Sequence, residues 1–157
     1  MFTEEEKLEI VDYLIETPGN IYIGCDSEKF KKKGVWFAKY TIVFIIHIEN
    51  ARGGRIFHYS VVEQVFDKQM NKPKMRLMTE VRKIVDCYLE FGELLEDRNV
   101  EIHLDINSDP DHNSNLVVKE ALGYVKGMTG LDAKIKPDAF AAAHCADHFV
   151  RNKHNKK

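Results

Sequence analysis

Residues 21–26 read Ile-Tyr-Ile-Gly-Cys-Asp, an apolar run of mostly strand-forming residues that ends in a carboxylate. Residues 100–106 read Val-Glu-Ile-His-Leu-Asp-Ile and place a second aspartate inside a second apolar run. Side chains alternate between the two faces of a strand, so Asp26 and Asp105 each lie opposite the aliphatic side chains of their own strand. If these strands are parallel neighbours, the two carboxylates lie side by side.

The patterns around these two runs predict an α/β fold. Short turns join the first three expected strands, which favours an antiparallel meander, and a helical crossover makes the fourth strand parallel to its partner. We therefore predict a five-stranded mixed sheet in the order 3-2-1-4-5, numbered along the chain, with the second strand antiparallel. This is the ribonuclease H-like topology, flanked by helices and extended by an N-terminal helix. The expected helices are about 4–16, 73–96, 116–127 and 137–151, and the expected strands are 21–26, 35–48, 55–66, 100–106 and 131–136.

Length and composition indicate one soluble domain. The chain has 157 residues, a formal net charge of −2 and no linker rich in Pro, Ser or Gly. We expect a single domain over 1–157, with a core at 21–151 and a basic tail at 152–157. No apolar run reaches the roughly 18 residues that span a bilayer, and the first residues are acidic, unlike those of a signal peptide. Three scattered cysteines suit a reducing compartment, so we expect a cytoplasmic protein without a membrane partner. The oligomeric state stays open.

Four acidic residues stand in otherwise apolar segments, namely Asp26, Glu80, Asp105 and Asp147. Glu80 borders the apolar stripe of its helix, and Asp147 lies within the apolar face of the last helix. Each taken singly could be a cap, a surface residue or an ion-paired residue, but the predicted topology brings all four elements together. Gathered carboxylates repel one another unless cations bind among them. Their hard oxygens suit two Mg²⁺ or Mn²⁺ ions, the arrangement of a two-metal phosphodiesterase, in which we expect Asp26 to bridge both ions.

Several short segments carry a family resemblance. They are residues 23–27 (Ile-Gly-Cys-Asp-Ser), 103–107 (His-Leu-Asp-Ile-Asn), 123–128 (Gly-Tyr-Val-Lys-Gly-Met), 135–138 (Ile-Lys-Pro-Asp) and 146–147 (Ala-Asp). Together they resemble the YkuK-type family of predicted ribonuclease H-like nucleases over about residues 21–151. The resemblance implies the ribonuclease H-like fold and supports the same four acids as the site. Cys25 stands where threonine is common in that family and Glu28 where glutamine is common, and neither is one of the four proposed ligands.

Other residues near the acids are candidates for supporting roles. The candidates for nucleic-acid contact are Lys29, Lys31, Lys32, Lys33 and Asn107, with Trp36 or Phe30 available to stack on a base. Glu28 is a candidate auxiliary acid, and His112 is a candidate for proton transfer or product release. Asp138 follows a proline and suits a helix N-cap, or a substitute for the fourth ligand.

These features favour a metal-dependent nuclease that hydrolyses phosphodiester bonds in RNA, RNA/DNA hybrid or structured DNA. One alternative is a DEDD-type 3′–5′ exonuclease that uses Asp26 and Glu28, although Ala142 and Ala143 stand where that class has Tyr or His. Another is a non-catalytic ribonuclease H-like module that binds nucleic acid or protein. A pure binder has no reason to gather negative charge where phosphates dock, which argues against the module.

Overall fold

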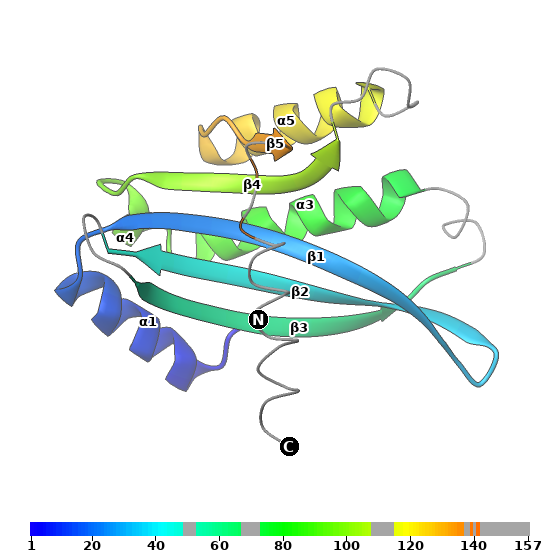
Figure 1. Cartoon of the computed structure of the whole chain (residues 1–157), viewed down its shortest axis with the longest axis horizontal. Coiled ribbons are helices and arrows are strands. Elements are labelled where there is room, and N and C mark those ends of the chain that lie inside the picture. The colour runs from blue at the N-terminus through cyan, green and yellow to red at the C-terminus, as the bar shows by residue number, and fades with distance from the viewer. Residues whose placement is uncertain (49–52, 67–72, 108–114, 137–138, 140, 142–157) are drawn as a thin grey trace.

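The computed structural model describes residues 1–48, 53–66, 73–107, 115–136, 139 and 141, and within them the sheet has the predicted order (Figure 1). Its strands are β1 (Asn20–Lys32), β2 (Val35–His47), β3 (Gly54–Gln64), β4 (Val100–Asn107) and β5 (Lys134–Lys136), arranged as β3-β2-β1-β4-β5. β2 is antiparallel to both of its neighbours, whereas β4 is parallel to β1 and β5 is parallel to β4. The predicted mixed sheet is thus confirmed, with a fifth strand shorter than predicted.

The hairpin of β1 and β2 is longer than the sequence indicated. The prediction that the first strand ends at Asp26 is wrong, because every residue of Asn20–Lys32 is paired with β2. The segment between the two predicted strands, residues 27–34, shrinks to a turn at Lys33 and Gly34, whose φ angles of 52° and 78° suit a tight hairpin turn. The tip of this hairpin extends past the neighbouring strands (Figure 1).

Cross-strand contacts explain why the strands continue so far. The rings of Phe30 and Phe37 stack with their centroids 5.6 Å apart, and the Lys31 ammonium lies 5.8 Å from the centre of the Trp36 ring. Such pairs stabilise a two-stranded ribbon even where its residues are polar. Three of the four candidate lysines therefore project from a strand, and only Lys33 lies in the turn.

Four helices are described, and they are α1 (Glu4–Glu16), α3 (Pro73–Glu90), α4 (Gly92–Leu95) and α5 (Asn115–Thr129). A capping box between Thr3 and Glu6 begins α1, whose bounds match the helix predicted over 4–16. The single helix predicted over 73–96 is divided at Phe91, whose N–H donates to the Tyr88 carbonyl three residues back instead of four. None of the helices that the structure describes is long and apolar enough to cross a membrane.

One face of the sheet carries the core. Ile21, Ile23 and Cys25 of β1 are fully buried there and belong to one cluster with side chains of α1, α3 and α5. The opposite face carries Asp26 and His103. Strand alternation, as predicted, thus separates the aliphatic residues of β1 from its aspartate.

Candidate active site

Asp26 and Asp105 lie where the two central parallel strands part. The pairing of β1 with β4 runs from Ile21 opposite Val100 to Gly24 opposite His103 and ends there. Each aspartate stands two residues beyond that last pair, and therefore on the same face of the sheet and at the same level. This register is consistent with the predicted juxtaposition, and the two carboxylates are close enough for the charge of Asp105 to raise the pKa of Asp26.

Asp26 is held by its own backbone neighbour. Its Oδ1 accepts a hydrogen bond from the Ser27 N–H at 2.9 Å. Burial raises the pKa of this half-buried carboxyl and the charge of Asp105 raises it further, while the Ser27 hydrogen bond and the cations of Lys136 and Arg76 oppose the rise. The two aspartates therefore interact, although Asp26 has no ion-pair partner within the described residues.

Asp105 is paired with a lysine from the neighbouring edge strand. Its Oδ1 lies 2.5 Å from Lys136 Nζ, and the two side chains are 33% and 42% exposed. The hydrogen bond to Asp105 is the main cause that raises the pKa of Lys136. This pair is open to solvent, so its contribution to stability is modest and Lys136 can leave Asp105 at little cost.

Glu80 approaches from α3 on the core side of β1. It is only 7% exposed, and its Oε1 accepts a hydrogen bond from the Ser27 hydroxyl. Burial raises the pKa of Glu80 to about 7, and the charges of Asp26 and Asp105 add to that rise. Ser27 thus joins two acids, since its N–H holds Asp26 and its hydroxyl holds Glu80.

The sequence analysis missed Ser27, and strand alternation could have found it. Residues i and i+2 of a strand share a face, so Ser27 follows Cys25 on the side that α3 covers. A hydroxyl on that side is a natural donor for an acid at the border of the helix's apolar stripe. Arg76, one turn before Glu80 on α3, was likewise missed as a cation that acts on both Asp26 and Glu80.

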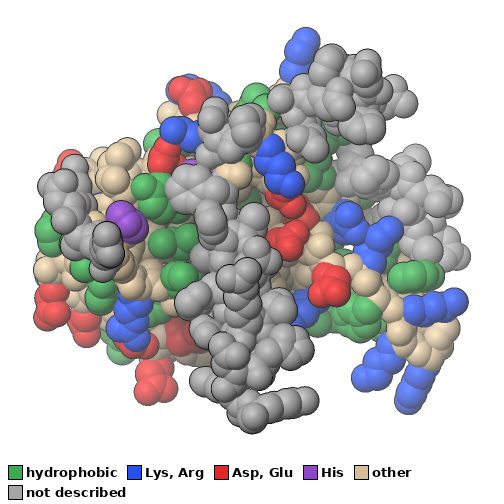
Figure 2. Space-filling view, in the orientation of Figure 1, with side chains coloured by type: hydrophobic (Ala, Val, Ile, Leu, Met, Phe, Trp, Pro, Cys, Tyr) green, Lys and Arg blue, Asp and Glu red, His purple; other side chains and the backbone are tan. Residues whose placement is uncertain are grey.

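Of the remaining candidate residues, the structure describes those on the hairpin of β1 and β2 but not the side chains of those from Asn107 onward. Glu28 is exposed on β1, and Lys29, Lys31, Lys32 and Lys33 are exposed along the outer half of the same hairpin. Figure 2 shows acidic side chains near the middle of one face, with Lys and Arg side chains gathered toward the hairpin tip. Asn107 ends β4, but its side chain, like the residues Asp147, His112 and Asp138, lies outside what the structure describes.

The three described acids fit a cation site by their chemistry. Each is an oxygen donor, and Asp26 and Glu80 both have raised pKa values caused in part by the other acids, which is the repulsion that a divalent cation relieves. As the side chains stand, no three His, Cys, Asp or Glu residues within the described ranges form a ligand group. In this arrangement Lys136 pairs with the carboxylate of Asp105, and the Ser27 hydroxyl donates to that of Glu80.

Comparison with known families identifies the fold. A family model described as ribonuclease H-like matches residues 7–151, which is most of the chain. Comparison with curated proteins gives no match. The sheet order, the strand directions and the extent of the match agree, and the chain therefore belongs to the ribonuclease H-like family.

Proposed function

We propose that this protein is a metal-dependent nuclease that hydrolyses phosphodiester bonds in RNA, RNA/DNA hybrid or structured DNA. The observation that supports the proposal is that Asp26, Glu80 and Asp105 interact electrostatically near the point where β1 and β4 part, with the pKa of Glu80 raised to about 7. A buried carboxyl whose pKa is strongly raised beside other acids is typical of a functional site.

The cofactor that suits this donor set is Mg²⁺ or Mn²⁺. Asp26, Glu80 and Asp105 would hold it, with Asp147 predicted as the fourth ligand. When bound, a pair of such ions supplies Lewis-acid activation of the phosphodiester and lowers the pKa of the attacking water. Carboxylates are the ligands that such hard cations prefer.

The chain's own residues prepare the site. The Ser27 N–H fixes one oxygen of Asp26, and the Ser27 hydroxyl fixes one oxygen of Glu80, so the free oxygens of both acids are limited in direction. Lys136 neutralises Asp105 in the present arrangement and, once released from it, offers a cation to a substrate phosphate. The buried position of Glu80 limits the water that would screen its own charge.

One observation favours the non-catalytic module as a second candidate. The Asp105–Lys136 pair shows that part of the acid cluster can be neutralised by the chain itself. A module that only binds would keep this pair and would bind nucleic acid through the lysines of the hairpin.

Cleavage of labelled single-stranded RNA, RNA/DNA hybrid and branched DNA, each with Mg²⁺ and with Mn²⁺, separates these candidates. We expect wild type to cleave at least one substrate and Asp26→Asn to lose about 100-fold or more of that activity, because it removes a ligand charge. Glu28→Gln is the matched control, since Glu28 is exposed and lies two residues from Asp26 on the same strand face.

The control variant also tests the exonuclease alternative. A loss in Glu28→Gln as large as in Asp26→Asn would favour the DEDD-type exonuclease over the four-acid site. Binding of all three substrates without cleavage of any would favour the module.

A further inference from the structure

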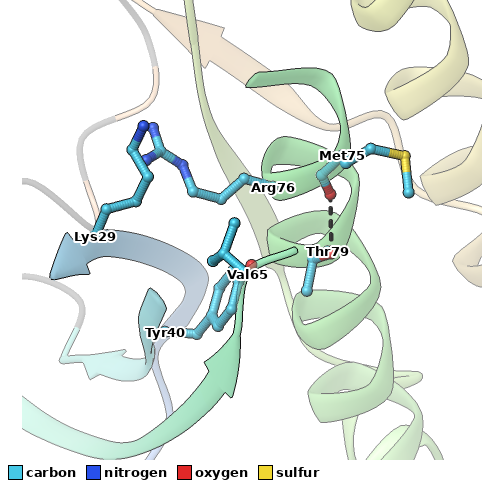
Figure 3. Close-up of a pocket in the computed structure, with 6 residues that line it drawn as sticks. All are labelled: Lys29, Tyr40, Val65, Met75, Arg76 and Thr79. Carbon is cyan, nitrogen blue, oxygen red and sulfur yellow. Dashed lines mark hydrogen bonds between the residues drawn. The ribbon is translucent and has the colours of Figure 1, made fainter. Parts of the chain in front are cut away.

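A small pocket lies beside the acid cluster and is made of different residues. It is formed by β1, β2, the residue that follows β3 and the first turns of α3 (Figure 3). Its lining residues are Lys29, Tyr40, Val65, Met75, Arg76 and Thr79. Arg76 connects the pocket to the acids electrostatically, because its charge lowers the pKa of both Asp26 and Glu80.

The floor of the pocket is held in place by internal contacts. Tyr40 is only 4% exposed, its hydroxyl is hydrogen-bonded with Thr79, and Lys83 Nζ lies 5.1 Å from the centre of its ring. The Thr79 hydroxyl donates to the Met75 carbonyl at 2.8 Å, as the dashed line in Figure 3 marks. These contacts within the chain hold the floor of the pocket.

Two cations, Lys29 and Arg76, line this pocket, and their charged ends point to the same side of it (Figure 3). Within the described residues, neither has a carboxylate at ion-pair distance, whereas Lys7, Lys83, Lys126, Lys134, Lys136 and Arg55 all do. Two like charges in one pocket repel each other, and an anion between them turns that repulsion into two favourable interactions.

The geometry points to a phosphate group as the anion, and we propose that the pocket binds a backbone phosphate of the nucleic acid strand whose cleavage occurs at the acids. The identity of this ligand rests on the proposed function. The planar guanidinium of Arg76 suits two oxygens of one phosphate, and Lys29 supplies a second positive charge from the facing strand. This phosphate is distinct from the one that is hydrolysed, so the pocket sets the path of the strand from the acids toward the start of α3.

Binding without cleavage tests the pocket directly. The probes are fluorescently labelled single-stranded RNA and RNA/DNA hybrid, titrated with protein in EDTA at several salt concentrations and followed by anisotropy. We expect Arg76→Gln to weaken binding about 10-fold and to reduce the slope of log K against log salt by about one, because one phosphate contact is lost. Arg76→Lys should recover part of the affinity, since lysine keeps the positive charge but lacks the planar guanidinium that can donate to two phosphate oxygens.

Arg82→Gln is the matched control for this experiment. Arg82 lies on the same helix, is exposed and does not line the pocket, so its loss should change affinity less than about twofold. Equal losses in Arg76→Gln and Arg82→Gln would overturn the proposal, because only the overall charge would then matter. If Arg76→Gln fails to fold, Lys29→Gln carries the same test, because Lys29 is an exposed residue of β1.

Competition with inorganic phosphate tests whether the pocket binds a phosphate of the nucleic acid backbone or free phosphate. We expect binding of the oligonucleotide to depend on Arg76, and we expect inorganic phosphate to compete with the oligonucleotide only weakly. Binding of inorganic phosphate at Arg76, with oligonucleotide affinity unchanged in Arg76→Gln, would overturn the assignment to nucleic acid. Failure of wild type to cleave would refute the nuclease but leave the binding result intact, so the two failures are distinguishable.

Discussion

Glu80→Gln tests whether the buried charge of Glu80 destabilises the fold. The pKa of Glu80 is raised from an ordinary 4.5 to about 7, chiefly by burial. A carboxyl whose pKa is higher in the folded chain binds its proton more tightly there, so its contribution to stability is complete below pH 4.5 and is lost as the pH rises to 7. Above pH 7 the ionised Glu80 destabilises the fold by about 3 kcal/mol, from 1.36 kcal/mol for each unit of pKa.

Glutamine keeps the size of Glu80 and can still accept the hydrogen bond from Ser27, but it carries no charge. We therefore expect Glu80→Gln to increase the free energy of unfolding at pH 8 by about 2–3 kcal/mol, or roughly 5–10 °C in Tm for a chain of this size. At pH 5 wild-type Glu80 is protonated in the folded chain, and the gain should shrink to under about 1 kcal/mol.

The assay is urea and thermal unfolding in EDTA at pH 5 and pH 8, with Glu28→Gln as the exposed control. The same scans with Mn²⁺ should stabilise wild type more than Glu80→Gln, because the variant has lost a ligand. A gain that is the same at both pH values would show that charge is not its cause. A variant less stable than wild type at pH 8 would refute the account of Glu80.

Three further predictions concern neighbouring residues. Ser27→Ala removes the hydroxyl donor of Glu80 and should lower the free energy of unfolding by about 1–3 kcal/mol at pH 8 and by less at pH 5; equal losses in urea titrations at both pH values would contradict this. Lys136→Gln frees Asp105, so calorimetry should find tighter Mn²⁺ binding than in wild type, and unchanged or weaker binding would show that the ion pair does not compete with the cation. Ile102→Ala should cost about 2–5 kcal/mol in urea unfolding because Ile102 is fully buried in the core cluster, and a loss below about 1 kcal/mol would contradict that place in the core.

The sheet and the placement of two acids were predictable because they depend on short-range patterns. Alternation along residues 21–26 and 100–106 fixes which face Asp26 and Asp105 occupy, and the order of turns and crossovers fixes the neighbouring strands. These features require no knowledge of side-chain packing. They survive in the structure almost unchanged.

The features that the sequence did not predict depend on contacts between distant segments. Four basic residues and a glycine signal a turn, yet stacking of Phe30 on Phe37 extends β1 through Lys32. The break after Glu90 is marked by the hydrogen bond from the Phe91 N–H to the Tyr88 carbonyl three residues back, and helical periodicity does not show it, since Phe91 continues the apolar stripe of Ile84 and Tyr88. Ser27 and Arg76 acquire their roles only once α3 packs against β1.

The central claim is that Asp26, Glu80 and Asp105 bind divalent cations, and isothermal titration of Mn²⁺ tests it most directly. Wild type and Glu28→Gln should bind Mn²⁺ with the same stoichiometry and affinity, whereas Asp26→Asn should lose at least one ion and bind any other more weakly. Because ionised Glu80 is needed for binding, affinity should fall as the pH drops from 8 to 6. Equal binding by wild type and Asp26→Asn, or no binding by either, would contradict the account.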